Sequence, residues 1–275
     1  MNDLFQVLSL SDTEGLPIGI AHEATGEIST QISFHPFGWD QEVEISKEEE
    51  KHPEQTITQK ITSCLVHTVK SWGPYDFTEM KPAERQLRIR DSYFADVFTA
   101  YCKLRMEAIG PEMIVFASCP KCKDNITWEI DLGSLDIYQA KSNQVIKKYE
   151  MSPPIKIGSN ECNWIEAAPV RWEPCYSSPA DTFATSDPRF RRNIFADAIR
   201  NAEGIETHGA LLMTDERLRT LSKRDIERLQ KIIDNNSGGP DLRSKIKCPR
   251  CGLEFAIISD WSYDHFFGSS SLPNL

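Results

Sequence analysis

Two short cysteine pairs are the residues in this 275-residue chain best suited to chemistry. They are Cys119-Pro120-Lys121-Cys122 and Cys248-Pro249-Arg250-Cys251, and positions 123 to 247 separate them. Two thiolates three positions apart on a tight turn can bind the same ion. Four thiolates complete the tetrahedral shell that structural zinc prefers. The repeated pattern therefore predicts one structural Zn²⁺ held by Cys119, Cys122, Cys248 and Cys251.

Two other interpretations of the cysteine pairs remain open at this point: redox dithiols, or unrelated turns with buried free thiols. A single pair beside a βαβ pattern would favour redox chemistry, but the sequence shows no such pattern. Gly252 follows the second pair and supplies the positive φ that such a turn often needs. Lys123 occupies the equivalent position after the first pair, where a left-handed residue costs about 1 kcal/mol.

Each cysteine pair is followed by a segment that resembles a β-strand. Residues 126–131 alternate apolar and polar side chains, and residues 253–258 begin in the same way. A turn with two cysteines plus a strand is half of a zinc ribbon. The sequence therefore predicts an α+β fold with a split zinc ribbon, helices, and an inserted β/helical subdomain between the two halves.

The other elements are expected from apolar periodicity, capping residues and chain breakers. In chain order they are short strands within 16–45, a helix at about 53–71 after the acidic run 48–50, a helix from an Asp91 cap to Gly110-Pro111, a strand at 113–116, irregular β structure over 144–175, a helix from Asp187-Pro188 to Gly204, helices capped by Thr214 and Ser222, and a breaker at 235–240.

These elements suggest four regions. They are an N-terminal β-rich segment (1–52), a helical region with the first cysteine pair (53–139), an inserted β/helical subdomain (140–244), and the second pair with an aromatic tail (245–275). In the tail, Trp261, Tyr263, Phe266 and Phe267 are expected to cover the ribbon or to insert into a neighbour.

Composition and charge bound the function. With 40% hydrophobic and 26% charged residues, the chain has the composition of a soluble globular protein. No apolar run is long enough to span a membrane, and the start lacks the pattern of a secretory signal. We therefore expect a reducing cytoplasm, where cysteines stay as thiols or metal ligands. The net charge of −10 argues against simple nucleic-acid binding.

The basic residues are concentrated in one region. Residues 189–250 carry a net charge of +5, which predicts a solvated helical face or, alternatively, a surface for an acidic neighbour or nucleic acid. Lys121, Lys123, Lys247 and Arg250 flank the cysteines. They would offset the −2 charge of a zinc tetrathiolate or, alternatively, contact phosphate.

No catalytic set is recognisable among the remaining polar residues. The sequence has no G-x-S-x-G, no Walker glycine loop and no H-E-x-x-H. Cys64 and Cys102 fall on apolar helix faces and are expected in the core, while Cys162 and Cys175 lack metal-ligand spacing. His265 is the one histidine near enough to Cys251 in sequence to replace a ligand. We expect a protein that is not an enzyme.

The order of several motifs resembles that of T-even-type phage baseplate hub and tail-assembly proteins, a family found also in related contractile injection systems. The motifs are Arg88-Ile89-Arg90-Asp91-Ser92-Tyr93-Phe94, Leu104-Arg105, Gly110, Cys119 to Cys122 followed by Glu129-Ile130-Asp131-Leu132, Cys248-Pro249-Arg250-Cys251-Gly252, and the aromatic ending from Trp261 to Phe267. The resemblance covers roughly residues 53–267 and is thin between 140 and 210.

This resemblance implies a structural or assembly protein of a contractile tail, made in the host cytoplasm and then either kept in the baseplate or released. Its implied partners are other baseplate, hub or tail proteins, with several copies around a symmetric axis as one arrangement. The competing hypothesis is a zinc-ribbon nucleic-acid-binding regulator that uses residues 189–250 and the lysines beside the cysteines. This hypothesis predicts salt-dependent binding to DNA or RNA.

Overall fold

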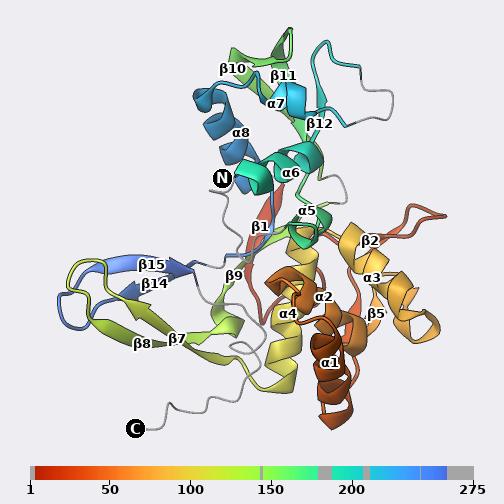
Figure 1. Cartoon of the computed structure of the whole chain (residues 1–275), viewed down its shortest axis with the longest axis vertical. Coiled ribbons are helices and arrows are strands. Elements are labelled where there is room, and N and C mark those ends of the chain that lie inside the picture. Colours follow the sequence, from red (N-terminus) through yellow and green to blue (C-terminus); the bar gives the residue numbers. More distant parts are fainter. Residues whose placement is uncertain (1–3, 143–144, 179–187, 207–210, 242, 259–275) are drawn as a thin grey trace.

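The computed structural model describes residues 4–142, 145–178, 188–206, 211–241 and 243–258 (Figure 1). These residues form a mixed helix and sheet fold, which confirms the α+β expectation at that level. Helices α1 to α4 lie in one part and two hairpins project from it. A second part is built from a β-hairpin and helices α6 to α8. Within the described residues, no helix is long and apolar enough to cross a membrane.

Helix α4 (Phe94–Ala108) is the central element of the helical part. Ten of its residues are buried, including Val97, Phe98, Tyr101 and Cys102. Such a helix needs partners on every side. It contacts α2 (Ile57–Thr68), the η2 turn (Leu132–Ser134) and β13 (Gly239–Pro240). The same part of the protein also contains α1 (Trp39–Lys51), β5 (Val69–Trp72), β6 (Tyr75–Asp76), η1 (Phe77–Glu79) and α3 (Pro82–Asp91).

Small antiparallel sheets surround this helical part. Strand β9 (Asp136–Ala140) lies between β1 (Phe5–Ser9) and β13 (Gly239–Pro240), so one sheet joins three distant parts of the chain. Strand β4 (Ile32–Phe34) pairs with β5, and β2 (Ile20–Ala21) pairs with β3 (Ile28–Ser29). A short η2 turn (Leu132–Ser134) precedes β9.

The second part is organised by one long hairpin. Strands β10 (Lys147–Ile157) and β11 (Asn160–Ala167) pair, and β12 (Ile199–Ala202) adds to β11. The helices of this part are α6 (Pro188–Ala198), α7 (Asp215–Leu218) and α8 (Lys223–Asn235). The short helix α5 (Glu173–Tyr176) contacts α6 and also α2 and α3 of the other part. The buried residues of the second part belong to the same core cluster as those of α4. The insert is therefore packed on the rest of the protein.

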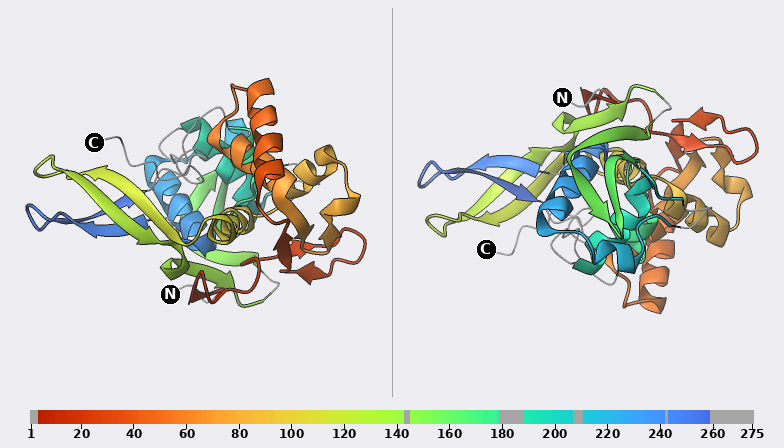
Figure 2. Two further views of the ribbon diagram at one scale, coloured as in Figure 1. Left: turned by 90° about the horizontal axis from the view of Figure 1, so that it is seen from below. Right: turned by 90° about the horizontal axis from the view of Figure 1, so that it is seen from above.

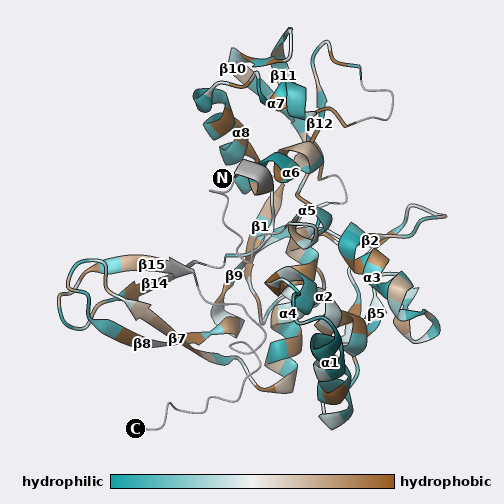
Figure 3. Ribbon diagram, viewed as in Figure 1, coloured by the Kyte–Doolittle hydropathy of each residue, from teal (hydrophilic) through white to brown (hydrophobic). Residues whose placement is uncertain are grey.

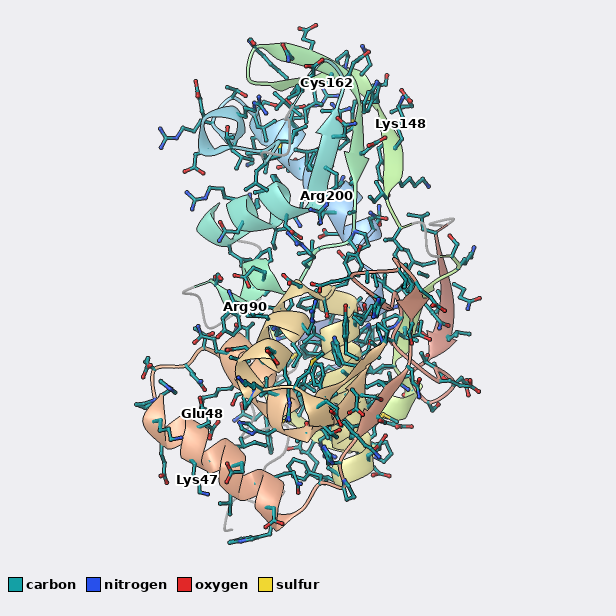
Figure 4. The ribbon with its side chains drawn as sticks, turned by 90° about the vertical axis from the view of Figure 1, so that its right-hand side faces the viewer. Lys47, Glu48, Arg90, Lys148, Cys162 and Arg200 are labelled. Atoms are coloured by element: carbon teal, nitrogen blue, oxygen red, sulfur yellow. The ribbon has the colours of Figure 1, made fainter. Side chains whose placement is uncertain are left out.

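The junction between the two parts centres on Arg90 and Trp172. The Arg90 guanidinium donates to both carboxylate oxygens of Glu173 and stacks 4.5 Å over the Tyr176 ring. Figure 4 shows Arg90 at the level where the two parts meet. The Trp172 indole N–H donates to Thr62 (2.8 Å), and its backbone N–H donates to the Ser92 carbonyl (2.7 Å).

Several predicted elements differ in the structure. Residues 39–45 are helix rather than strand, because α1 begins after Gly38, whose N–H donates to Gln41. The acidic run 48–50 closes this helix and does not open the next one. Figure 3 shows α1 as largely hydrophilic, and only its Ile45 is buried, so the segment has a weak apolar pattern. The 1–52 segment is therefore not purely β-rich.

The predicted cap at Asp91 is wrong. Asp91 ends α3, and α4 begins at Phe94 without a side-chain cap. The reason is tertiary, because Ser92 between the helices accepts from the Trp72 indole N–H (2.9 Å) and donates to the Arg88 carbonyl. These contacts fix the chain in extended conformation there and outweigh the local capping preference.

The predictions for the second part hold only in part. Residues 147–167 are β structure, as predicted, and the irregularity of this hairpin is a register shift between Glu150 and Ile155, where the prolines at 153 and 154 lie and where a strand tolerates proline. Helix α6 ends at Ala198, and β12 separates it from Gly204. Thr214 and Ser222 do cap α7 and α8, as predicted, whereas Asp187 lies outside the described residues.

Three of the four predicted regions contribute strands to one sheet. Strand β1 pairs with β9, so the N-terminal segment belongs to the sheet of residues 136–140. At the other end, β13 pairs with β9, so the chain has rejoined that sheet by residue 239. Sequence patterns could not show this, because pairing between strands far apart in the chain depends on tertiary packing.

A buried carboxylate in α4 makes the fold sensitive to pH. Asp96 is fully buried and accepts from the N–H groups of Ile18 (2.8 Å) and Gly19 (3.2 Å). Burial raises the pKa of Asp96 to about 7, although the two N–H groups oppose this shift. Between the unfolded pKa of 3.8 and about 7, the folded state therefore holds a proton that the unfolded state releases.

We expect the contribution of Asp96 to the free energy of unfolding to be complete below pH 3.8. This contribution, up to about 4 kcal/mol, should be lost as the pH rises through 7. Asp96→Asn should remove this pH dependence of stability. Chemical denaturation of the native protein and the variant from pH 4 to 8 measures the free energy of unfolding of each. The stability advantage of the native protein over the variant should shrink steadily with pH, and a constant difference would contradict the assignment.

Candidate metal centre

The two cysteine pairs lie on the turns of two similar hairpins. Strands β7 (Glu112–Ser118) and β8 (Asn125–Asp131) flank the first pair, and β14 (Arg243–Lys247) and β15 (Glu254–Ile258) flank the second. Figure 2 shows both hairpins projecting side by side from the body. Each pair therefore has a strand on both sides, whereas the sequence predicts a preceding strand only for the first pair.

The two turns have the same hydrogen-bond pattern. The N–H of Cys119 donates to Asp124 and that of Lys123 donates back to Cys119, both at 2.9 Å. In the second turn the N–H of Cys248 donates to Leu253 and that of Gly252 donates back to Cys248, also at 2.9 Å. This repeat orients both cysteines of each pair toward the other hairpin.

The four predicted ligands meet. The Sγ atoms of Cys119, Cys122, Cys248 and Cys251 all lie within 4.8 Å of one another. The Sγ atom of Cys119 lies 3.6 Å from that of Cys251, and the Sγ atom of Cys122 lies 3.6 Å from that of Cys248, so both contacts cross from one hairpin to the other. The cluster is consistent with a metal site, and its four thiolates are the donor set that soft or borderline cations prefer.

The electrostatics of the cluster suit a cation. The N–H groups of Cys122 and Lys121 lower the pKa of the Cys119 thiol to about 6. The N–H of Asp124 also favours the Cys122 thiolate, but burial and the neighbouring thiols outweigh it and raise the pKa of Cys122 to about 12. Four thiols this close cannot all ionise without a positive charge between them. The residues present therefore fit a metal ion.

A small apolar core surrounds the sulfur atoms. Buried Ile126 and Ile246 lie beside buried Cys119 and Cys248, and the partly buried neighbours are Ala117, Cys122, Cys251, Leu253 and Phe255. This cluster is separate from the main core. It holds only two buried aliphatic side chains, worth roughly 2–3 kcal/mol each, so the hairpins have little apolar material of their own.

Two of the four basic residues beside the cysteines have acidic partners. Arg250 lies 3.5 Å from Asp124 on the other hairpin, and Lys247 lies 3.8 Å from Glu254. These exposed pairs favour local charge balance over a phosphate-binding patch, since two of the four basic side chains already face a carboxylate.

The two turns differ in backbone strain, as the sequence predicted. Lys123 has φ of 60° and Gly252 has φ of 71°, both left-handed. A Cβ added at Gly252 would contact no atom within 4 Å, so the cost of a side chain there comes from the left-handed backbone conformation alone. Gly252→Ala should therefore destabilise by about 1 kcal/mol.

The reciprocal change Lys123→Gly should be neutral or stabilise by up to about 1 kcal/mol, because glycine removes the strain but adds unfolded-state entropy. Lys123→Ala controls for the lost charge and should not stabilise. Thermal unfolding of the metal-loaded proteins compares the three changes. A stabilising Gly252→Ala would contradict the role given to the positive φ.

The other candidate ligands do not join the cluster. Cys64, Cys102, Cys162 and Cys175 are buried elsewhere, and burial raises the pKa of each thiol. This confirms the core position expected for Cys64 and Cys102. No histidine of the described residues lies in the cluster. His265 and the aromatic residues from Trp261 onward lie outside the described residues.

No protein-family model matches this chain, and no curated protein and no solved structure is detectably similar to it. Function is therefore inferred from the chain's own residues and their arrangement.

Proposed function

We propose that this protein is a non-enzymatic structural or assembly component of a phage contractile-tail baseplate, with a structural Zn²⁺ in a split ribbon. The observation that carries the proposal is the convergence of four sulfur atoms from two cysteine pairs that are separated by residues 123 to 247 of the chain. A four-cysteine site leaves no open coordination position for water or substrate, so its metal holds structure rather than performing a reaction.

Zinc is the ion that this donor set favours. Four thiolates in a small, partly buried site are typical of structural zinc, and zinc binding contributes on the order of 10 kcal/mol to folding such sites. The two hairpins share only the small apolar core described above, so a bound metal would stabilise the contact between them more than their side chains can. When bound, the ion would join the middle of the chain to residues near 250.

The residues that carry the family resemblance also have structural roles here. Arg90 binds Glu173 across the junction, and Ser92 links Trp72 to the loop of Trp172. Arg105 donates to the carbonyls of Gly110 and Glu112 and so fixes the chain where it enters β7. These contacts position elements, which supports a scaffold rather than a reaction site.

The nucleic-acid alternative has weaker support. Among the basic residues of 189–250, Arg192 pairs with Asp215 (2.9 Å), Arg200 with Asp197 (3.7 Å), and Arg228 with Asp225 (3.4 Å). Side chains engaged in such pairs have less charge to offer to phosphate. The total charge of −10 adds a long-range repulsion from nucleic acid.

Two measurements test the proposal. Metal analysis of purified protein should find about one zinc per chain, and a value near zero would exclude the structural site. Affinity purification of the tagged protein from phage-producing cells should recover baseplate or hub proteins. Recovery of nucleic acid, lost on raising the salt concentration, would instead favour the regulator.

A further inference from the structure

Residues of α6, α7 and α8 line a hollow of about 220 Å³. These helices lie in the second part of the protein, away from the two hairpins that carry the cysteines (Figure 1). Its floor is apolar, with Phe195 and Leu221 only 2% and 8% exposed and with Leu218 and Ile226 beside them. An apolar cavity of about 150 Å³ is enough to hold benzene. This hollow therefore has room for one aromatic ring.

The rim of the hollow is positively charged. Arg191 and Arg192 come from α6 and Arg219 follows α7, while Asp215 is the acidic residue among those that line it. Asp215 is paired with Arg192 at 2.9 Å. Three guanidinium groups against one carboxylate leave a net charge of +2 on a protein whose total is −10. An aromatic group carried next to carboxylates would match both floor and rim.

We propose that this hollow binds the acidic aromatic segment of this same chain, residues 260–267. The segment reads Asp260-Trp261-Ser262-Tyr263-Asp264-His265-Phe266-Phe267, with four aromatic residues, two carboxylates and no Lys or Arg. It lies outside the described residues. One aromatic ring of this segment fills the apolar floor, and Asp264 faces the arginines. This inference does not depend on the tail-assembly proposal.

Two further points favour this occupant. From the end of β15 to Phe267 is nine residues, an extended reach of about 30 Å, comparable to the diameter of a small domain. Attachment to the same chain also gives the segment an effective concentration in the millimolar range.

A second exposed apolar surface, the outer face of the β7–β8 hairpin, is less suitable for binding residues 260–267. The outer face of β7–β8 exposes Phe116 (62%), but it also carries Glu112, Glu129 and Asp131. Its charge would repel a segment that contains Asp260 and Asp264, whereas the rim of the hollow attracts it.

Photo-crosslinking in the full-length, metal-loaded chain tests the proposal. Phe266 is replaced by p-benzoylphenylalanine, the protein is irradiated, and crosslinked peptides are mapped by mass spectrometry. We expect crosslinks within one chain to residues of α6, α7 or α8. Arg219→Glu should reduce their yield about fivefold, the effect of roughly 1 kcal/mol. Arg219 is exposed, so this change should leave the fold intact, and circular dichroism checks it.

The matched control is Lys231→Glu, which makes the same charge change at an exposed position of α8 outside the hollow. It should leave the yield unchanged, and Arg219→Glu combined with Asp264→Lys should restore it. Crosslinks to β7–β8, or an equal yield in Arg219→Glu and the native chain, would overturn the proposal. Crosslinked dimers as the main product would also overturn it, since the occupant would then come from a second copy.

Discussion

Cys119→Ser should release the metal and separate the two hairpins while the main body stays folded. The ligand sulfur is lost from a cluster whose four Sγ atoms lie within 4.8 Å. Loss of a structural metal typically costs more than about 4 kcal/mol. The surrounding core cannot compensate, because it is small and separate from the cluster around α4.

Hydrogen exchange measured by mass spectrometry distinguishes this local opening from global unfolding. Amides of β7, β8, β14 and β15 should lose protection, and those of α4 should keep it. Zinc content should fall from about one per chain to near zero. Cys162→Ala is the matched control: this cysteine is also buried but lies outside the cluster, so its loss should leave the zinc in place. Unchanged zinc in Cys119→Ser would contradict the shared site.

Trp172→Ala should have the second largest effect and should destabilise the whole protein by about 4 kcal/mol. The side chain is fully buried, lies 5.4 Å from the Phe94 ring, and donates its indole N–H to Thr62. Its removal leaves a large cavity at the junction of the two parts. It also leaves the Thr62 hydroxyl without the indole donor.

Urea denaturation followed by circular dichroism measures this loss without relying on tryptophan fluorescence. Trp172→Phe keeps much of the ring volume and loses the hydrogen bond, so it should cost less, about 1–2 kcal/mol. Trp39→Ala is the surface control, because Trp39 is 76% exposed, and it should change stability by under about 0.5 kcal/mol. An equal loss of unfolding free energy in Trp172→Ala and Trp39→Ala would contradict the role of Trp172 in stabilising the junction.

The candidate site was predictable because its geometry is local. Each Cys-Pro-x-Cys turn is fixed within six residues by its own hydrogen bonds, and the need for a left-handed residue at 123 and 252 follows from that turn. The meeting of the two turns was a hypothesis from their similarity. It is confirmed by the positions of the four sulfur atoms, whereas the ion and the ribbon assignment remain proposals.

The less predictable parts depend on distant contacts. Asp91 has the chemistry of a helix cap, yet Ser92 bonded to Trp72 determines where α4 begins. The three strands β1, β9 and β13 form one sheet although β1 begins at Phe5 and β13 ends at Pro240, and β13 consists of Gly239-Pro240, which the sequence predicts as a chain breaker. The hollow between α6 and α8 likewise arises from residues that are unremarkable in sequence, and packing brings them together.

The sequence by itself determined the ligand types, their spacing, the strain at Lys123 and the caps at Thr214 and Ser222, because each depends on a few neighbouring residues. Only the tertiary structure decided which strands pair, where α4 starts and how the insert packs on the body. Those features depend on burial and on hydrogen bonds between residues far apart in the chain, and no local pattern encodes them.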